Sequence, residues 1–237
     1  MKVLAIESSA KAASVALCDG SNLLAQYFMN SGLTHSATLL KMTEDLLNNL
    51  ALNIRDLDYI AVANGPGSFT GIRIGVSAAI GLCWGAALPV CGVSTCAAMA
   101  HHIEEPDTVI CPVMDARRDQ VYTASFKYAD GCITRLTPDR AIPVTELAAE
   151  AVSSDKPYIL LGDGAELARE AFTASGAVFR LAPSLLRLQS AWGVARASLD
   201  APKVSANELE PNYLRVSQAE RERQEKMRLR ENSGSAG

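Results

Sequence analysis

Two rounds of the same apolar and polar pattern run along the chain. Each round begins with three short strand-like stretches and continues with a helix, a strand and a second helix. The first round predicts strands over 2–7, 13–19, 22–29, 58–63 and 89–93, and helices over 34–50 and 68–87. The second round predicts strands over 108–114, 120–127, 131–136 and 157–161, and helices over 144–153, 164–174 and 184–199.

Two β-β-β-α-β-α units in tandem predict an α/β protein with a duplicated fold and a cleft between its halves. This is the layout of the actin-like fold (ASKHA, RNase H-like), whose two halves hold ATP between them. We expect a first subdomain over residues 1–105 and a second, smaller one over 106–217 that the last helix closes across the junction. Residues 218–237 are polar and end in Ser-Gly-Ser-Ala-Gly, so we expect a mobile tail there.

Composition and charge narrow the functional class. With 49% hydrophobic and 20% charged residues, the chain is expected to be globular. A net charge of −4 predicts no broad basic face, which argues against tight RNA binding by this chain alone. The chain starts with a strand rather than a signal peptide, and the apolar run over 75–90 is too short and too glycine-rich for a membrane span. Six cysteines without Cys-x-x-Cys spacing are expected to be buried thiols, which indicates a cytoplasmic protein.

The most specific motif is Val-Ala-Asn-Gly-Pro-Gly-Ser-Phe-Thr-Gly-Ile-Arg-Ile-Gly over residues 62–75. A predicted strand enters a turn that contains Gly65 and Gly67, and a helix follows at once. Such a unit directs backbone amides toward an anion. The next glycine, Gly71, makes the spacing one residue too wide for a dinucleotide fingerprint, and no Gly-Lys-Ser/Thr follows. The turn is therefore either a phosphate site of another kind or a structural turn.

The first predicted strand ends at Glu7, and two hydroxyl residues, Ser8 and Ser9, follow it. In actin-like ATPases such residues face the phosphates and their metal, whereas the alternative is an acid that ties the first hairpin to the sheet. Ser8-x-x-Lys11 also matches the acylating pair of some serine hydrolases, but that pair needs a helix and these residues lie in a hairpin turn, which favours a solvated lysine. The candidate vestigial phosphate or nucleotide site comprises Glu7, Ser8, Ser9, Gly65 and Gly67.

The histidine cluster His101-His102-Ile103-Glu104-Glu105 could place His101 and Glu105 on one metal. Pro106 ends that helix and a third ligand is not evident, so we expect these side chains to point into solvent and no metal to bind.

Three further segments have ordinary interpretations. Gly162-Asp163-Gly164 could grip a nucleotide but is interpreted as a plain strand-to-helix turn. Asp115–Tyr122 is interpreted as a polar hairpin tip, and Pro211–Arg215 as an extended segment anchored by its tyrosine.

Four separated segments together resemble the TsaB (YeaZ) family. They are Ala5–Ser9, Asn64–Gly75, Asp115–Tyr122 and Pro211–Arg215. The catalytic paralogue of this family, TsaD, has His-x-x-x-His on the helix that follows the strand at 89–93, where it binds a metal. Here Thr95 and Met99 stand at those positions, and neither can replace an imidazole for such a cation. The resemblance therefore implies a protein with no catalytic residues and no metal of its own.

The resemblance implies a non-catalytic scaffold that docks a TsaD-like enzyme. That enzyme modifies N6 of adenosine 37 in tRNAs that read ANN codons, and a TsaE-like ATPase joins the assembly. No cofactor is expected to bind this chain tightly, and ATP or ADP is expected only in the partner complex. The rivals are a stand-alone ATP-dependent kinase of the same fold and, less favoured, a peptidase, for which the sequence shows no zinc site, Ser-His-Asp set or Cys-His pair.

The helix predicted after the glycine turn combines an apolar stripe with a series of small residues. Ile72, Val76, Ile80 and Trp84 step by four residues along one side and predict a core-facing stripe. Its many small residues indicate close approach of another backbone, either the chain's own sheet or a partner. The resemblance implies that this helix and the preceding one form a four-helix contact with the TsaD-like subunit, and a homodimer when that subunit is absent. The implied interface residues are Leu39, Thr43, Leu46, Gly71, Ile72, Gly75, Ala78, Ala79 and Leu82.

Overall fold

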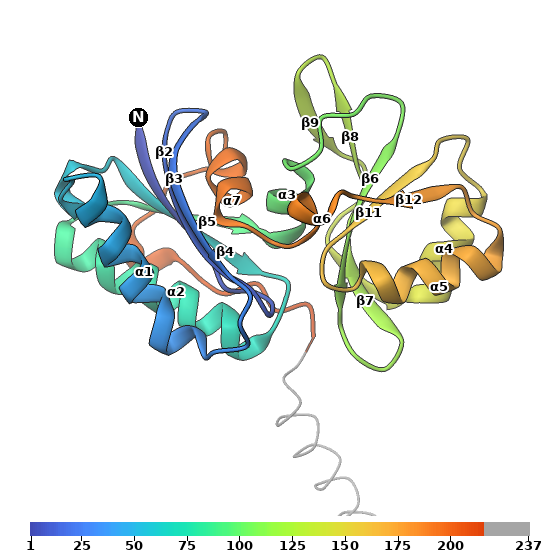
Figure 1. Ribbon diagram of the computed structural model, residues 1–237, viewed down its shortest axis with the longest axis horizontal. Helices are drawn as coiled ribbons and strands as arrows, with labels where there is room; N and C mark the ends of the chain where they lie inside the picture. The colour runs from blue at the N-terminus through green and yellow to red at the C-terminus, as the bar shows by residue number, and fades with distance from the viewer. Residues whose placement is uncertain (216–237) are drawn as a thin grey trace, which may run out of the picture.

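The computed structural model describes residues 1–215, which form two lobes that each contain a β-sheet (Figure 1). The strands of the first lobe are β1 (Lys2–Glu7), β2 (Ala13–Asp19), β3 (Asn22–Met29), β4 (Tyr59–Gly65) and β5 (Val90–Ser94). Its helices are α1 (His35–Asn49), α2 (Phe69–Ala86) and α3 (Thr95–Ala100), with a 3₁₀ turn at Ile54–Asp56. The tail expected over 218–237 lies outside the described residues.

The second lobe repeats the order of strands and helices. Its strands are β6 (Val109–Asp115), β7 (Gln120–Thr123), β8 (Phe126–Ala129), β9 (Cys132–Arg135), β10 (Arg140–Pro143), β11 (Tyr158–Leu161) and β12 (Phe179–Leu181). Its helices are α4 (Val144–Val152), α5 (Ala165–Ser175) and α6 (Ser184–Arg187), and the chain continues into α7 (Ala191–Ser198) and a 3₁₀ turn at Ala206–Glu208.

Apolar residues are buried on both faces of the first sheet, whose strand order is β3-β2-β1-β4-β5. Strand β1 runs antiparallel to β2 and parallel to β4. Leu4 and Ile6 pack with the residues of α1 and α2, whereas Val3 and Ala5 pack with those of α7. Both faces of β1 are therefore covered by helices, which is why its sequence is a continuous apolar run.

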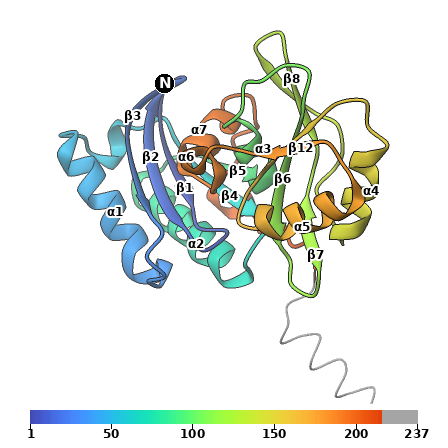
Figure 2. The ribbon, with the colours of Figure 1, turned by 45° about the vertical axis from the view of Figure 1, so that its right-hand side comes forward.

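The second sheet has the order β10-β7-β6-β11-β12, and the β8–β9 hairpin joins it through β6. Cys111 and Val113 of β6 pack with α4 and α5, and Ile110 packs with Cys96 and Met99 of α3 on the other side. Helices α3 and α7 thus lie between the two sheets, while α1 with α2 and α4 with α5 form the outer layers (Figures 1 and 2). The predicted duplicated α/β fold is confirmed.

Two predicted elements are each split in the structure. The strand expected over 120–127 becomes β7 and β8 because the chain changes partners at Ser125, whose carbonyl oxygen accepts a hydrogen bond from Leu136 N at 2.7 Å. The helix expected over 184–199 becomes α6 and α7 because Leu188 is extended and Ser190 begins a new helix. The short strands β10 and β12 were not predicted, since three or four residues carry little periodicity.

The end of the described chain returns to the first lobe rather than staying in the second. Helix α7 packs on the first sheet, and Val204 exchanges two backbone hydrogen bonds with Val90 of edge strand β5 at 2.8 and 2.9 Å. The second unit that we expected over 106–217 therefore differs from the observed one, which ends where the chain leaves α6.

Five of the six cysteines are buried free thiols in this part of the chain, and Cys132 at the β8–β9 hairpin is exposed. Burial raises the pKa of Cys18 to about 11 and that of Cys111 to about 12, so these thiols stay protonated. One helix of the described chain, α2, is long and apolar enough to cross a membrane by length and composition. Its inner side belongs to the core that covers β4.

The predicted apolar stripe of α2 is only half right. Ile72 and Val76 are buried, but Ile80 is partly buried and Trp84 is 65% exposed. Steps of four residues advance 400° around a helix with 3.6 residues per turn, so three such steps place Trp84 about a third of a turn away from Ile72. The buried side continues instead through Ala79 and Cys83.

The small residues of the first half of α2 serve this chain's own packing. A Cβ at Gly71 would overlap the carbonyl oxygen of Ser8, and a Cβ at Gly75 would overlap Ser8 Oγ. Ser8 Oγ also donates to the Gly71 carbonyl oxygen at 2.9 Å. Gly81, on the exposed side of the same helix, is different, because a Cβ there would meet nothing within 4 Å among residues 1–215 beyond the helix itself.

Replacing Gly71 by alanine is expected to destabilise the protein by about 1–3 kcal/mol, because the added methyl group forces α2 away from Ser8. Gly81→Ala, the matched control, is expected to stabilise it by up to about 1 kcal/mol, because glycine disfavours a helix interior. Thermal unfolding followed by circular dichroism measures both, at about 2–4 °C per kcal/mol for a chain of this size. Equal shifts would show that the Ser8 contact does not require glycine.

Candidate functional site

A cleft of about 230 Å³ lies where the β1–β2 turn of the first lobe faces the loop after β6 in the second. It is smaller than the roughly 300–1,000 Å³ of ordinary small-molecule sites. The residues that line it are Ser9, Ala10, Lys11, Gly67, Ser68, Met114, Asp115, Arg117 and Asp163. Of these, Ser9 and Gly67 were among the predicted site residues, and the other seven were not.

The glycine turn contacts the chain itself. Gly65 and Gly67 have φ angles of +127° and +156°, and an added Cβ would overlap the carbonyl oxygens of Asn212 and Ser9 respectively. The amide of Ser68, which could have faced an anion, donates to Ser9 O at 2.7 Å. Gly67 therefore lies at the cleft with Ser9, while Gly65 lies against the C-terminal segment. These contacts favour the structural interpretation of the turn over the phosphate-binding one.

Glu7 is the most unusual ionisable group near the cleft. Its side chain is fully buried, and Oε1 accepts a hydrogen bond from Ser9 N at 2.6 Å. Oε2 and the Ser9 hydroxyl have no hydrogen-bond partner within the described chain. Desolvation raises the pKa of Glu7 to about 7, because burial penalises the carboxylate more than the hydrogen bond from Ser9 N stabilises it. The negative charge of Asp163 raises this pKa further.

Asp163 belongs to the Gly-Asp-Gly turn between β11 and α5. Burial also raises its pKa, and its Oδ1 accepts a hydrogen bond from Gln189 Nε2 at 2.9 Å. A Cβ at Gly162 would overlap Val113 O, and one at Gly164 would come within 2.8 Å of Asp115 N. The two glycines therefore allow this turn to lie against β6, as expected of a plain structural turn.

The cleft offers few free groups to the nucleotide and divalent cation that an actin-like fold implies. Phosphates need free donors, but Ser68 N of the glycine turn donates to Ser9 O, and Arg117 at the cleft pairs with Asp115. Lys11 is the other cation of the lining. Within residues 1–215, no group of three or more His, Cys, Asp or Glu could hold a metal ion.

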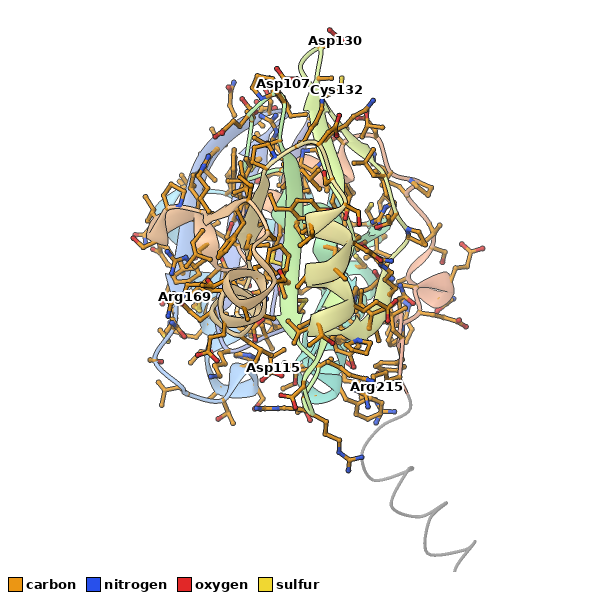
Figure 3. All side chains as sticks on the ribbon, turned by 90° about the vertical axis from the view of Figure 1, so that its right-hand side faces the viewer. Asp107, Asp115, Asp130, Cys132, Arg169 and Arg215 are labelled. Atoms are coloured by element: carbon orange, nitrogen blue, oxygen red, sulfur yellow. The ribbon has the colours of Figure 1, made fainter. Side chains whose placement is uncertain are left out.

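The Asp115–Tyr122 segment is a tight hairpin tip, as interpreted. Arg117, Arg118 and Asp119 all have φ between +55° and +66°, a left-handed conformation that reverses the chain. Asp115 holds this turn by accepting from Arg117 N at 2.7 Å. Figure 3 shows Asp115 and Arg215 close to each other at the same end of the molecule.

The Pro211–Arg215 segment ties the glycine turn to that hairpin tip. Asn212 N donates to Asn64 O at 2.7 Å, and Arg215 Nη1 donates to Ala116 O at 2.8 Å. The Tyr213 ring stacks on Phe69 with centroids 4.7 Å apart, so the tyrosine anchors the segment as expected.

The histidine cluster is structural, but the expectation that it points into solvent is wrong for His102. That ring is buried, with Nδ1 bonded to Leu186 O at 3.0 Å and Nε2 to Ser190 Oγ at 3.0 Å. Burial lowers its pKa to about 4, so it is neutral. Glu104 pairs with Arg196, and Glu105 pairs with Arg180. Glu105, one of the two side chains that could have shared a metal, is therefore used to bind a neighbouring element.

Thr95 and Met99 lie on α3, which is buried between the two sheets. Both side chains have zero exposure, and Met99 belongs to the core that includes Ile110 and Phe126. Neither residue lines the cleft. A ligand-binding role for these positions would need polar groups where this chain has an apolar core.

The interface predicted on α1 and α2 is mostly inside the protein. Seven of its nine residues are buried in the chain's own core, because they face the first sheet or the Ser8 turn. The buried residues are Leu39, Thr43, Leu46, Gly71, Ile72, Gly75 and Ala79. Ala78 and Leu82 are partly exposed, and Leu40 is 52% exposed beside them on α1. The outer surface of the two helices is therefore formed by neighbours of the predicted residues.

We define the helix face as a set of small and apolar residues of α1 and α2 that are exposed or partly exposed. It comprises Leu40, Leu47, Ile74, Ala78, Gly81, Leu82 and Gly85. An added Cβ at Gly81 or Gly85 would meet nothing outside the helix within 4 Å in the described chain. A strict period of 3.6 residues applied to the helix at 68–87, in place of steps of four residues, would have predicted its part of this face.

Comparisons with known proteins identify the family of this chain. The model of one family, described as TsaD: tRNA N6-adenosine threonylcarbamoyltransferase, matches residues 30–222. The tRNA threonylcarbamoyladenosine biosynthesis protein TsaB of Bacillus subtilis is 30% identical over 229 residues, which cover 93% of this chain and 96% of that protein. The chain belongs to the TsaB (YeaZ) family.

Solved structures support the same family and fold. YeaZ from Pseudomonas aeruginosa has a TM-score of 0.74 at 26% identity, over 90% of this chain and 99% of that one. Component A of the (R)-2-hydroxyglutaryl-CoA dehydratase of Acidaminococcus fermentans has a TM-score of 0.50 at 14% identity, over 85% of this chain and 97% of that one, and shares the fold alone. The fold is the duplicated actin-like fold that the sequence predicts.

The four segments that carry the TsaB resemblance are neighbours in space. Ala5–Ser9 contacts the glycine turn and α2. The glycine turn contacts Pro211–Arg215, and Arg215 reaches the Asp115–Tyr122 tip. The motif residues of the family therefore form one connected set of contacts around the cleft.

Glu7 is expected to make the folding stability fall as pH rises. Its pKa rises from 4.5 to about 7 on folding, so between these values the folded state keeps a proton that the unfolded state has lost. Glu7→Gln removes this titration and should flatten the stability profile across this window. Denaturant unfolding at a series of pH values measures the effect.

The matched control for this experiment is Glu170→Gln, at an exposed position of α5, which should keep the wild-type profile. If the Glu7→Gln and wild-type profiles stayed parallel from pH 4.5 to about 8, Glu7 would not titrate in the folded state as its burial requires.

Proposed function

We propose that this chain is the non-catalytic subunit of a complex that makes threonylcarbamoyladenosine in tRNA. Its relatives in Bacillus subtilis and Escherichia coli are named tRNA threonylcarbamoyladenosine biosynthesis protein TsaB. In this proposal the chain docks a TsaD-like enzyme, which modifies N6 of adenosine 37 in tRNAs that read ANN codons. The chain acts in the cytoplasm and meets tRNA only through the complex.

The burial of Thr95 and Met99 is the observation that carries the non-catalytic assignment. Both residues stand where a TsaD-like enzyme has its metal-binding histidines, both are fully buried, and Met99 belongs to an apolar core. Neither a threonine hydroxyl nor a thioether suits such a cation, and the position offers it no path to substrate. The cleft adds to this support, because the amide of Ser68 and the space beside Gly67 are both taken by Ser9.

The helix face is the surface we assign to the enzyme subunit. Gly81 and Gly85 carry no side chain, so the backbone of a partner helix can approach α2 closely there. Leu40 adds an exposed apolar side chain from the neighbouring α1. Two parallel or antiparallel helices of a partner would complete a four-helix contact with this surface.

The remaining parts of the assembly are proposed on family grounds. A TsaE-like ATPase joins the complex, and ATP or ADP binds only once the partner is present. A homodimer through the same two helices stays a prediction, and the burial of most of the residues named for it leaves other surfaces open to self-association.

Gly81→Arg is expected to give a folded protein that no longer captures a TsaD-like subunit, because the long charged side chain stands where the partner backbone must approach. Co-purification with a tagged TsaD-like protein should fall at least tenfold, which corresponds to about 1.4 kcal/mol. Ala174→Arg, at an exposed position of α5, is the matched control and should bind normally. Unchanged capture by a folded Gly81→Arg protein would remove the helix face from the proposal.

The isolated chain is expected to hydrolyse ATP at less than about 1 per second, the low end for ordinary enzymes. It should also hold no stoichiometric zinc or iron, because Thr95 and Met99 replace the metal ligands. Phosphate release and elemental analysis measure the two properties. One tightly bound metal per chain, or faster turnover, would contradict the non-catalytic assignment.

A further inference from the structure

Strand β3 is flanked by a cavity on each face of the first sheet. On the α1 face, a groove of about 520 Å³ is lined by β3 and by the side of α1 that carries Lys41 and Asp45, which pair at 2.8 Å. On the opposite face, a cavity of about 340 Å³ is bounded by β3, α6 and the beginning of α7. We call it the α6 pocket. Its volume is in the range of small-molecule sites, whereas that of the cleft is below it.

The lining of the α6 pocket is mostly apolar. Its apolar residues are Leu23, Phe28, Leu185, Leu186, Leu188 and Trp192. Within residues 1–215, the other residues of the lining are polar and none of them is charged. A charged molecule would lose its hydration in this pocket without gaining an opposite charge, so the lining selects for an uncharged one.

Several apolar side chains around the pocket are exposed. Leu185 is 92% exposed, and Leu23 and Phe28 are each 45% exposed. Single exposed leucines are common on protein surfaces, but apolar side chains that gather around a cavity are typical of a binding site. A bound molecule would remove this surface from water, which is the main source of affinity in such a site.

Ser190 offers the pocket a hydrogen-bond acceptor. Leu186 O carries no proton, so His102 Nδ1, 3.0 Å away, holds the ring proton and donates it. Because the buried ring is neutral, its Nε2 accepts, and the Ser190 hydroxyl donates to it at 3.0 Å. The Ser190 proton is therefore used inside the protein, and its oxygen keeps lone pairs that can accept from a ligand.

Gln26 offers the complementary donor. Trp192 N can only donate, and it donates to Gln26 Oε1 at 3.0 Å, so Nε2 of the same amide points away from this bond. Nε2 has no hydrogen-bond partner within residues 1–215. Ser190 stands two residues before Trp192, and therefore the acceptor and the donor belong to the same wall of the pocket.

Trp192 gives this wall a flat aromatic surface. Its ring stacks on His102, with centroids 5.9 Å apart and an interplanar angle of 22°. The bonds of His102 to Leu186 and Ser190 hold that ring in place, so the wall is formed before any ligand arrives. Gly193 permits this close packing, since a Cβ there would come within 2.6 Å of His102 Nε2.

We propose that the α6 pocket binds a small uncharged aromatic molecule with a hydrogen-bond donor and an acceptor side by side, as in a carboxamide. The ligand N–H donates to Ser190 Oγ, and its carbonyl oxygen accepts from Gln26 Nε2. The aromatic body lies among Phe28, Leu185 and Trp192. A cavity of roughly 150 Å³ holds one benzene molecule, so one of about 340 Å³ holds two fused rings.

The α6 pocket and the helix face lie on opposite sides of the first sheet. Helices α1 and α2 cover one face of this sheet, and α7 covers the other. A molecule in the pocket therefore leaves the helix face open to a protein partner. The inference does not depend on the proposed function, and the failure of one would leave the other standing.

The indole N–H signals in a nitrogen-15 NMR spectrum test the pocket with an internal control. The chain has two tryptophans, of which Trp192 lines the pocket, while Trp84 donates to Asn207 Oδ1 from α2. Titration with indole-3-carboxamide, a two-ring probe, should shift the Trp192 signal and leave that of Trp84 in place, with a Kd of about 1 mM or tighter. Indole-3-carboxylate, of the same shape but charged, should bind at least tenfold more weakly.

Two variants test the polar and the apolar contacts separately. Gln26→Glu keeps an acceptor for Trp192 N and removes the Nε2 donor, so it should weaken binding of the carboxamide at least tenfold. Leu185→Ala removes apolar contact from a position too exposed to affect folding, and it should weaken binding by about threefold or more. Leu136→Ala, at a leucine that is 48% exposed in the second lobe, is the matched control and should bind as the wild type does.

Several results would overturn the inference. A Trp192 signal that stays unchanged up to about 5 mM indole-3-carboxamide would assign the pocket to a protein side chain or to no ligand. Equal affinities for the carboxamide and the carboxylate would exclude the uncharged class. Equal affinities for indole and indole-3-carboxamide would exclude the roles of Ser190 and Gln26, and this comparison uses the wild type, so it holds even if Gln26→Glu fails to fold. Unchanged binding by Leu185→Ala would place the probe elsewhere.

Discussion

The contact between the first hairpin and the N-terminal part of α2 is the constraint on which the rest of the structure depends. Ser8 Oγ donates to Gly71 O, and Ser68 N donates to Ser9 O, at 2.9 and 2.7 Å. Backbones can come this close only where Cβ atoms are absent, so glycines stand at the points of contact. The contact fixes the position of β1 relative to α2, and the C-terminal segment then packs on the outside of the same turn through Asn212.

That packing also decides what the cleft can do. The same kind of turn binds phosphate elsewhere because its amides stay free and its glycines admit a ligand. Here the amide of Ser68 and the space beside Gly67 are both taken by Ser9. Glu7, left with one unpartnered carboxyl oxygen in the same region, keeps its proton to a higher pH than an exposed carboxyl group, because burial raises its pKa to about 7. Under the proposed function, the working surfaces therefore lie on the outside of the molecule.

The sequence predicted the fold well because most of its elements are long and strongly periodic. Leu39 and Leu46 of α1 and the apolar run of β1 have no other stable arrangement than burial against a neighbouring layer. The site was predicted less well for two physical reasons. Small residues such as Gly71 and Gly75 fit equally well against the chain's own backbone or a partner's, and only the position of Ser8 decides between them. The partners of buried polar groups such as His102 come from segments distant in sequence, here Leu186 and Ser190, which periodicity cannot reveal.

Helix α1 links the two outer surfaces that remain. Its buried side, through Leu39 and Leu46, is fixed on the first sheet by the core and cannot rotate without opening that core. One exposed side borders the helix face and the other borders the groove beside β3. A rigid helix of this kind presents both surfaces in a constant relative orientation. A subunit bound on one side is therefore held at a defined angle to whatever binds on the other, which is the property that the proposed scaffold role requires.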